Sequence, residues 1–198
     1  MPSWPELGEA RRRLYEVAIV LFGDRGFHGV SIRDLAQALG QQPGAIYGHV
    51  ESKQQLLYEL VLIGQQEHRN RIRAALLDTG REPQEQLAAL TRAHVLIHLE
   101  FGALARVTNR EARALSDEQR AVIAGIRDEV ERLFRDVIER GVALGAFVVD
   151  DLDLVLAAIG AIGIRAAEWW SPESRHTAEH IADTYADFAL RLVATGAR

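Results

Sequence analysis

Hydrophobic residues recur at helical spacing through almost the whole chain, and no segment alternates between apolar and polar residues for long. In the first such segment, one stripe is formed by Leu14, Val17, Ala18, Leu21 and Phe22, as on the buried face of an amphipathic helix. Glycines, prolines and capping residues interrupt the pattern and divide the chain into about nine segments. The sequence therefore predicts an all-α fold of about nine helices.

Capping residues and helix breakers indicate where these helices begin and end. Ser52 with Gln55, and Ser116 with Gln119, have the spacing of a capping box, in which two residues satisfy each other's backbone N–H groups. Gly40 is a typical residue just beyond a helix C-terminus. From these signals we expect helices over residues 11–24, 31–39, 43–50, 52–77, 83–100, 102–113, 116–144, 151–170 and 177–194.

The stretch from Ser31 to Lys53 contains two short predicted helices joined by a tight turn. Ala36 is small where the second helix has to cross the first closely, and Gly40 stands where the chain reverses. This pattern is typical of a helix-turn-helix, which presents its second helix to the DNA major groove. The net charge of the chain is −5, so a local patch has to bind the DNA. We expect a DNA-binding domain at residues 1–55 and a helical body at 56–198.

Residues around the second short helix are candidates for DNA contacts. Gln42 can read an adenine edge and Ala45 can touch a thymine methyl group. Arg33, Tyr47, His49 and Lys53 are candidates for phosphate contacts, which carry affinity rather than sequence information. This helix carries no arginine, so we expect modest base readout and reliance on a dimer. A three-helix bundle that binds no nucleic acid is the disfavoured alternative. The predicted DNA-binding residues are Ser31, Arg33, Gln42, Pro43, Gly44, Ala45, Tyr47, His49 and Lys53, the only lysine, with one or more of Arg11, Arg12 and Arg13.

The head of the chain resembles that of TetR-type transcriptional repressors. The matching residues are Ala18, Phe22, Gly26, Phe27, Ser31, Ile32, Leu35, Ala36, Gly40, Gly44, Ala45, Ile46, Tyr47, His49, Val50, Lys53 and Leu56. The number of predicted helices and the chain length also agree with the family. Gln41 and Gln42 depart from the residues usual there, and Val50 stands where phenylalanine is commoner. These departures concern the base contacts rather than the fold.

The resemblance implies a homodimer formed by the last two helices. In the first of them, residues 157–163 are mostly alanine and glycine, and small residues let another helix approach closely. A tightly packed pair of helices within one chain is the alternative. The resemblance also implies that the middle helices bind a small-molecule inducer, which releases the protein from a palindromic operator.

The C-terminal half resembles a narrower branch, the repressors of fatty-acid and sterol catabolism that respond to acyl-CoA thioesters. The similar stretches are 109–115, 140–147 and 165–170. Arg165 and Trp169 are four residues apart and share a helix face, where they can hold an anionic, partly planar ligand. Arg106 and Arg110 can meet CoA phosphates, together with Arg113. Core packing for the first pair, and a solvated face for the second group, are the alternatives.

Two histidine pairs, His94 with His98 and His176 with His180, have a spacing that can share a metal ion. Solvated or packed histidines are the favoured interpretation, and His68, His94 and His98 can instead line the ligand pocket. We therefore expect no metal and no cofactor.

The chain shows no nucleophile elbow, phosphate-binding glycine loop or metal motif, so an enzyme is a disfavoured alternative, as is a helical adaptor that binds only protein. There are no cysteines, which excludes disulfides and thiolate ligands. The start of the sequence shows no signal-peptide pattern, and the longest apolar run, 154–164, is too short to span a bilayer. A cytoplasmic protein is expected.

Overall fold

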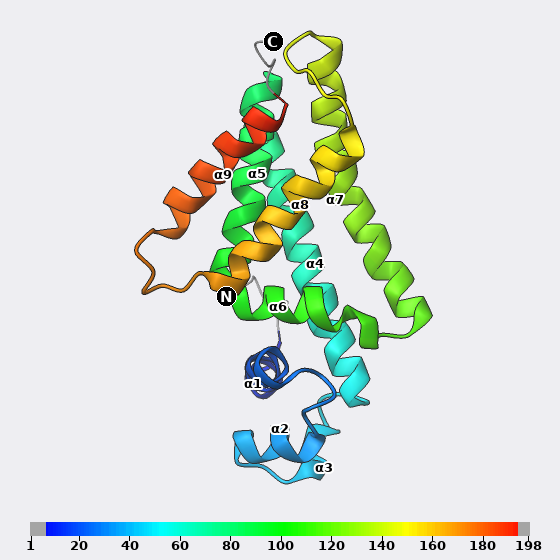
Figure 1. Ribbon diagram of the computed structural model, residues 1–198. Coiled ribbons are helices and arrows are strands. Elements are labelled where there is room, and N and C mark those ends of the chain that lie inside the picture. Colours follow the sequence, from blue (N-terminus) through cyan, green and yellow to red (C-terminus); the bar gives the residue numbers. More distant parts are fainter. Residues whose placement is uncertain (1–6, 194–198) are drawn as a thin grey trace. The chain divides into compact units, whose positions relative to one another are not determined.

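The computed structural model describes residues 7–193, and within that range all regular structure is helical (Figure 1). The predicted all-α fold is confirmed. Among the described residues, nine α-helices and one short 3-10 helix follow one another: α1 (Glu9–Arg25), α2 (Ile32–Leu39), α3 (Pro43–Ile46), α4 (Lys53–Leu77), α5 (Pro83–Glu100), α6 (Gly102–Arg110), η1 (Glu111–Ala114), α7 (Asp117–Ala143), α8 (Leu152–Trp169) and α9 (Ala178–Leu192). In residues 7–193 no single helix is long and apolar enough to cross a membrane; only the stretch from α5 to η1, bent by 99°, meets that test as a pair.

Three predicted helices end two or more residues earlier than expected. The helix predicted over 43–50 ends at Ile46, because the amides of Gly48 and His49 bond to carbonyls three residues back and form a turn. The helix predicted over 102–113 ends at Arg110, and η1 follows. The last helix, predicted to Ala194, ends at Leu192, and Ala194 lies outside the described residues.

Side-chain caps account for most helix starts. The Ser31 hydroxyl accepts from the Asp34 amide while the Asp34 carboxylate accepts from the Ser31 amide. Ser116 and Gln119 exchange the same pair of bonds before α7. Ser52 accepts from the Gln55 amide at the start of α4. These contacts join residues three apart, which is why the sequence pattern locates them well.

The chain divides into two compact units. The head unit contains the residues up to Glu67 together with Ala103–Gly125, and the body unit contains His68–Gly102 and the residues from Ile126 onward. The boundary expected after residue 55 therefore does not coincide with the one between the units. The physical reason is that α4 continues unbroken, and α6 packs within the same unit as α1 and the first half of α4.

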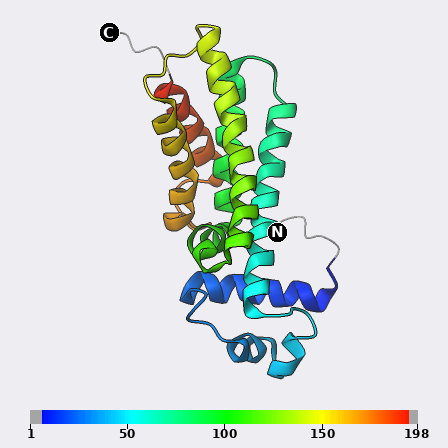
Figure 2. The same cartoon turned by 90° about the vertical axis from the view of Figure 1, so that its right-hand side faces the viewer.

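The core of the head unit is formed where α1, α2, α3 and the start of α4 meet, and Figure 2 shows α1 lengthwise with α2 and α3 to one side of it. Glycines allow α6 to approach two helices closely. A Cβ atom at Gly23 of α1 would lie 3.7 Å from the Ala103 carbonyl oxygen, and one at Gly64 of α4 would lie 2.5 Å from Cγ2 of Thr108. The fully buried side chains include Leu14, Phe22, Leu35, Ile46, Leu56 and Leu57.

In the body unit, α5 packs against both α8 and α9 (Figure 1). Its larger core also draws on the end of α4, on α7 and on the turn after α7, where Phe147 packs directly against Gly141. A smaller core lies between α5, α8 and α9 and consists of Val95, Leu99, Ala166, Ile181 and Ala182. Helix α5, which carries His94 and His98, is thus packed against other helices on several sides.

Candidate nucleic-acid interface and buried histidine cluster

The turn between α2 and α3 presents a short exposed edge in the head unit. Ile46 and Ala36 are buried beneath it, and Gly40 adopts φ 67°, a left-handed conformation that glycine takes without strain. Gln42 occupies the N-cap position of α3 but makes no side-chain capping bond. The edge presents the exposed residues Arg33, Gln41, Gln42, Gly44, Ala45 and Tyr47, with Pro43 and His49 half-buried.

Two of the predicted DNA contacts are already engaged within the protein. The Ser31 hydroxyl donates to the Asp34 carboxylate and accepts from the Asp34 amide, so both of its roles serve the cap of α2. The Lys53 ammonium donates to the carbonyl oxygens of Phe27 at 2.9 Å and Val30 at 2.7 Å. Each of these two side chains is therefore held by its own chain, which gives it a structural role besides the predicted contact with DNA.

Lys53 secures the turn that joins α1 to α2. Its Nζ atom lies 4.1 Å from the centroid of the Phe27 ring, over which a cation is favourably placed. Burial lowers the pKa of the Lys53 ammonium, and the negative charge of Asp34 partly opposes that shift. The same turn is held from η1, where the Glu111 carboxylate accepts from the Phe27 amide at 3.1 Å. No sequence signal pointed to Glu111, which is 84 residues away.

The three arginines near the start of α1 differ in their contacts. Arg11 donates to the Glu59 carboxylate at 2.9 Å and to the Tyr15 hydroxyl, which itself donates to Glu59. Burial raises the pKa of Tyr15 to about 12, and its bond to Glu59 adds to that shift. Arg12 and Arg13 are exposed. Arg11 therefore ties α1 to α4, whereas its two neighbours face solvent.

The four predicted ligand-binding residues lie in two different units. Arg106 and Arg110 belong to α6 of the head unit, and Arg165 and Trp169 belong to α8 of the body unit. The Trp169 side chain is 49% exposed, so the interpretation of this residue as core packing is wrong. Arg165 is exposed one helical turn before it. Neither unit brings all four residues into one site.

Exposed apolar side chains gather on α8 and α9. Leu154, Ile164 and Trp169 of α8 are exposed although they are large and apolar, and so are Phe188 and Leu192 of α9. Along α8 the exposed positions recur at helical spacing opposite the buried ones, so they form one continuous face. Such a face usually marks an interaction surface.

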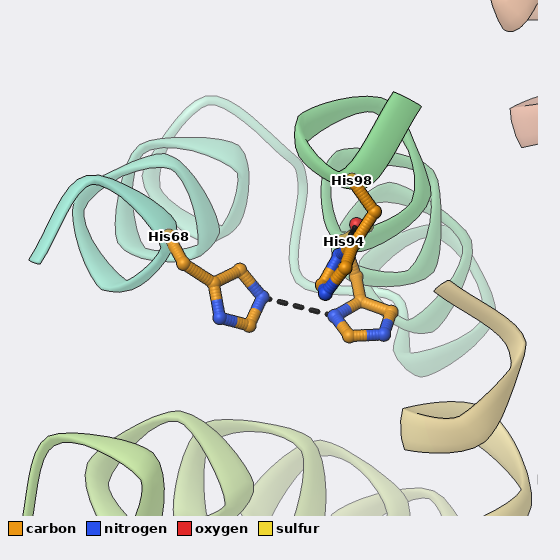
Figure 3. Close-up of side chains that lie close together, drawn as sticks. All are labelled: His68, His94 and His98. Atoms are coloured by element: carbon orange, nitrogen blue, oxygen red, sulfur yellow. Dashed lines mark hydrogen bonds between the residues drawn. The ribbon is translucent and has the colours of Figure 1, made fainter. Parts of the chain in front are cut away.

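Three histidines meet in the interior of the body unit. His68 comes from α4, and His94 and His98 come from consecutive turns of α5, with their rings turned toward one another (Figure 3). His68 Nε2 lies 2.9 Å from His94 Nδ1. One nitrogen of each ring lies within 4.8 Å of the corresponding nitrogens of the other two. The spacing of His94 and His98 is visible in the sequence, and the packing of α4 on α5 brings the His68 ring into contact with them.

Burial keeps these rings neutral. It lowers the pKa of His68 to about 3, with smaller contributions from the charges of His98 and Arg127. Burial also lowers the pKa values of His94 and His98, while the backbone carbonyls of Gly160 and His94 act in the opposite direction. All three rings therefore present uncharged nitrogens near neutral pH.

Gly163 of α8 provides the space that two of these rings occupy. A Cβ atom there would lie 2.4 Å from His94 Nε2 and 3.1 Å from His98 Nδ1. By contrast, a Cβ atom at Gly160 would meet nothing within 4 Å. At Gly163, then, the small residue serves packing inside the chain and not the approach of a second chain, which is one correction to the interpretation of the 157–163 stretch.

Two family models match most of the chain. The model described as bacterial regulatory proteins, tetR family, matches residues 14–60, and the one described as tetracyclin repressor-like, C-terminal domain, matches residues 80–193. The first model covers the helix-turn-helix, and the second covers most of the body unit together with residues 103–125 of the head unit.

Individual relatives agree with these models over nearly their full length. The HTH-type transcriptional repressor KstR2 of Mycolicibacterium smegmatis is 29% identical, with 96% of this chain and 93% of that protein covered. A bacterial regulatory protein in the tetR family from Rhodococcus RHA1 is 32% identical, with 96% and 100% covered and a TM-score of 0.88. AibR, solved in complex with isovaleryl coenzyme A and operator DNA, shares the fold at 23% identity, with 91% and 97% covered and a TM-score of 0.81.

Proposed function

Because the chain belongs to the TetR family of bacterial regulatory proteins, we propose that it is a ligand-responsive transcriptional repressor that binds a palindromic operator as a homodimer. The observation that carries this proposal is the exposed edge around α3, held on a head whose turn is secured by Lys53 and Glu111. A rigid support of this kind is what a recognition element needs, since base contacts depend on a fixed register.

The exposed residues of the edge are assigned the contacts with DNA. Arg33 and Tyr47 face phosphates, and Gln42 and Ala45 face base edges, with Pro43, Gly44 and His49 completing the surface. Ser31 and Lys53 act as positioning residues. Lys53 has a third N–H bond beyond the two that its carbonyl partners take, so a phosphate contact in addition to the structural role is compatible with its geometry.

The exposed apolar face of α8 and α9 is assigned to the homodimer. Two copies related by two-fold symmetry would bury Leu154 and Ile164 of each chain, together with Phe188 and Leu192. Dimerisation compensates for the modest readout of one short helix, because it presents two heads to two half-sites.

An acyl-CoA thioester is the proposed class of inducer. The isovaleryl coenzyme A bound to AibR, a protein of the same fold, makes this class the first probe. Arg165 and Trp169 share the exposed face of α8 and remain candidates for the ligand, as do Arg106 and Arg110 of α6. Because α6 follows α5 directly and contacts both α1 and α4 at glycines, a ligand that moves α6 changes the position of the head helices.

The experiment that tests the proposal is a mobility-shift titration with DNA from upstream of the protein's own gene. We expect a dimer-sized complex that resists competitor DNA and is released by an acyl-CoA. A protein that binds this DNA no better than competitor DNA contradicts the repressor assignment. Binding that no acyl-CoA in a series of chain lengths and ring systems reverses contradicts the inducer class alone.

The candidate ligand residues are tested separately from the DNA contacts. Trp169→Ala should leave operator affinity within about twofold, provided that the dimer persists, and should raise the acyl-CoA concentration needed for release. Arg132→Ala, which changes an exposed arginine of α7 that has no assigned contact with ligand or DNA, is the control. Equal release of the wild type and the Trp169 variant contradicts the assignment of this residue.

A further inference from the structure

The hydrogen bonds of the histidine cluster indicate which ring nitrogens are free to bind a ligand. His98 Nδ1 lies 2.8 Å from the backbone oxygen of His94, and His94 Nε2 lies 3.2 Å from that of Gly160. A carbonyl oxygen only accepts, so each of these nitrogens carries the hydrogen. His98 Nε2 and His94 Nδ1 therefore present lone pairs.

The third ring can complete this arrangement. His68 Nε2 and His94 Nδ1 lie 2.9 Å apart, and one hydrogen between them satisfies both in the absence of a ligand. If His68 carries its hydrogen on Nδ1 instead, three lone pairs converge, from His68 Nε2, His94 Nδ1 and His98 Nε2. Two nitrogens bound tetrahedrally to zinc at about 2.0–2.1 Å lie about 3.3 Å apart. The His68 and His94 nitrogens therefore need to separate by only a few tenths of an ångström. The His98 nitrogen lies within 4.8 Å of both and needs to approach them by at most about 1.5 Å.

Contacts around the cluster resemble those that support metal ligands. A ligating histidine normally donates its other N–H to a carbonyl or carboxylate, which fixes its orientation, and His94 and His98 already do so. Neutral rings bind a cation without first losing a proton, and burial holds these rings neutral.

Two further residues indicate that the packing makes room for a polar site. Gly163 leaves the space in which His94 and His98 lie, since any larger residue would displace the His94 ring. Thr91, one turn before His94 on α5, is fully buried, and its hydroxyl has no hydrogen-bond partner among the described residues. A core built only for stability would not leave the Thr91 hydroxyl unsatisfied beside three imidazoles, because a polar group that is buried without a partner costs free energy.

We propose that His68, His94 and His98 bind a divalent transition-metal ion, with zinc as the best match, through His68 Nε2, His94 Nδ1 and His98 Nε2. Three imidazole nitrogens suit zinc and leave a fourth position for water or for a donor atom of a ligand. The ion would link α4 to α5 and, through the partners of His94, to α8. This inference concerns the body unit alone and stands whether or not the proposed function is right.

Metal titration of the untagged full-length protein tests the proposal. After treatment with EDTA and its removal, Co²⁺ should give the visible absorption bands of a tetrahedral nitrogen site at about one ion per chain, and Zn²⁺ should abolish them. His68→Gln and His98→Gln should each lower the affinity by at least about tenfold. The double variant His176→Gln/His180→Gln removes an exposed pair with the same spacing, whose stacked rings lie 4.9 Å apart, and should bind as the wild type does.

Stability measurements keep the result interpretable if a variant folds poorly. Zn²⁺ should raise the melting temperature of the wild type and of the His176/His180 variant, but not that of His68→Gln. His68 is the least buried of the three histidines, so its variant is the one expected to retain the fold. Failure of the wild type to bind Co²⁺ or Zn²⁺ overturns the proposal, as does loss of binding only in the His176/His180 variant.

Discussion

The Lys53 ammonium group donates to the Phe27 carbonyl oxygen at 2.9 Å and lies 4.1 Å from the centroid of the Phe27 ring. One residue thus accepts a hydrogen bond from the lysine and offers it an aromatic face. Arginine is the usual cation in this chain, but its planar guanidinium is larger and cannot place a compact charge between the ring and two carbonyls. This packing explains why the single lysine stands at this position.

Replacement of Lys53 should destabilise the head unit. Lys53→Met removes two charged hydrogen bonds and should lower the free energy of unfolding by about 2 kcal/mol, measured by urea denaturation. Operator affinity should fall for all sequences, whereas its salt dependence should change little. Arg33→Met is the matched variant, since this exposed side chain should cost no stability but reduce the slope of log affinity against log salt by about 0.9. A similar reduction for Lys53→Met would show a direct phosphate contact.

Tyr47 should matter for DNA binding and not for folding. Its side chain is 57% exposed, so Tyr47→Ala should change stability by less than about 0.5 kcal/mol. Operator affinity should fall about tenfold through loss of a phosphate contact. Tyr47→Phe isolates the hydroxyl group and should show most of the loss. If Tyr47→Ala shifts the operator at the same protein concentration as the wild type, the assignment of Tyr47 to a DNA contact is contradicted.

The cap of α2 should give the head unit a defined response to acid. Hydrogen bonds from Ser31 lower the pKa of Asp34 from 3.8 to about 2, with a smaller effect of Arg25. The unfolded chain therefore takes up the proton first, and the stabilisation present above pH 3.8 is lost as the pH falls toward 2.

This response can be measured as a difference between two proteins. The wild type should be more stable than Asp34→Asn by a constant amount above pH 3.8, and the difference should shrink as the pH approaches 2. Urea denaturation across that range measures both free energies. A difference that does not vary with pH would show that the carboxylate charge is not what stabilises the cap.

The crossing of α4 and α6 should tolerate no side chain at Gly64. A Cβ atom there would lie 2.5 Å from Cγ2 of Thr108, so Gly64→Ala should cost about 1–3 kcal/mol. Adding Thr108→Ser removes the obstructing methyl group and should restore most of the loss. Gly125→Ala in α7 meets nothing within 4 Å and should instead stabilise the protein by about 0.5–1 kcal/mol. Thermal unfolding of the four proteins distinguishes these outcomes.

A charge on the exposed face of α8 should prevent dimerisation. Ile164→Arg places two like charges across the proposed two-fold interface, and sedimentation should show a monomer that retains its helical circular dichroism. Val122→Arg introduces the same charge on α7, at a position of similar exposure, and should remain dimeric. A dimeric Ile164 variant would mean that another surface joins the two chains.

Helix positions and most caps were predictable from the sequence because they depend on neighbours within a few residues. Ser31 and Asp34 are three apart, and Ser116 and Gln119 have the same spacing. The shortening of α3 was not predicted. It arises because the amides of Gly48 and His49 form turn hydrogen bonds instead of continuing the helix. The surface edge of α3 was anticipated, but the internal engagement of Ser31 and Lys53 was not.

The sequence by itself determined the helical fold, the helix-turn-helix and its exposed edge, because periodicity and capping are local properties of the chain. Only the tertiary structure decided how distant side chains are used. It joined Lys53 to Phe27 and Val30, placed Trp169 on the surface, and brought His68 to His94 and His98. Such contacts arise when separate helices pack, and the pattern of a single helix carries no information about the side chains that another helix will present to it.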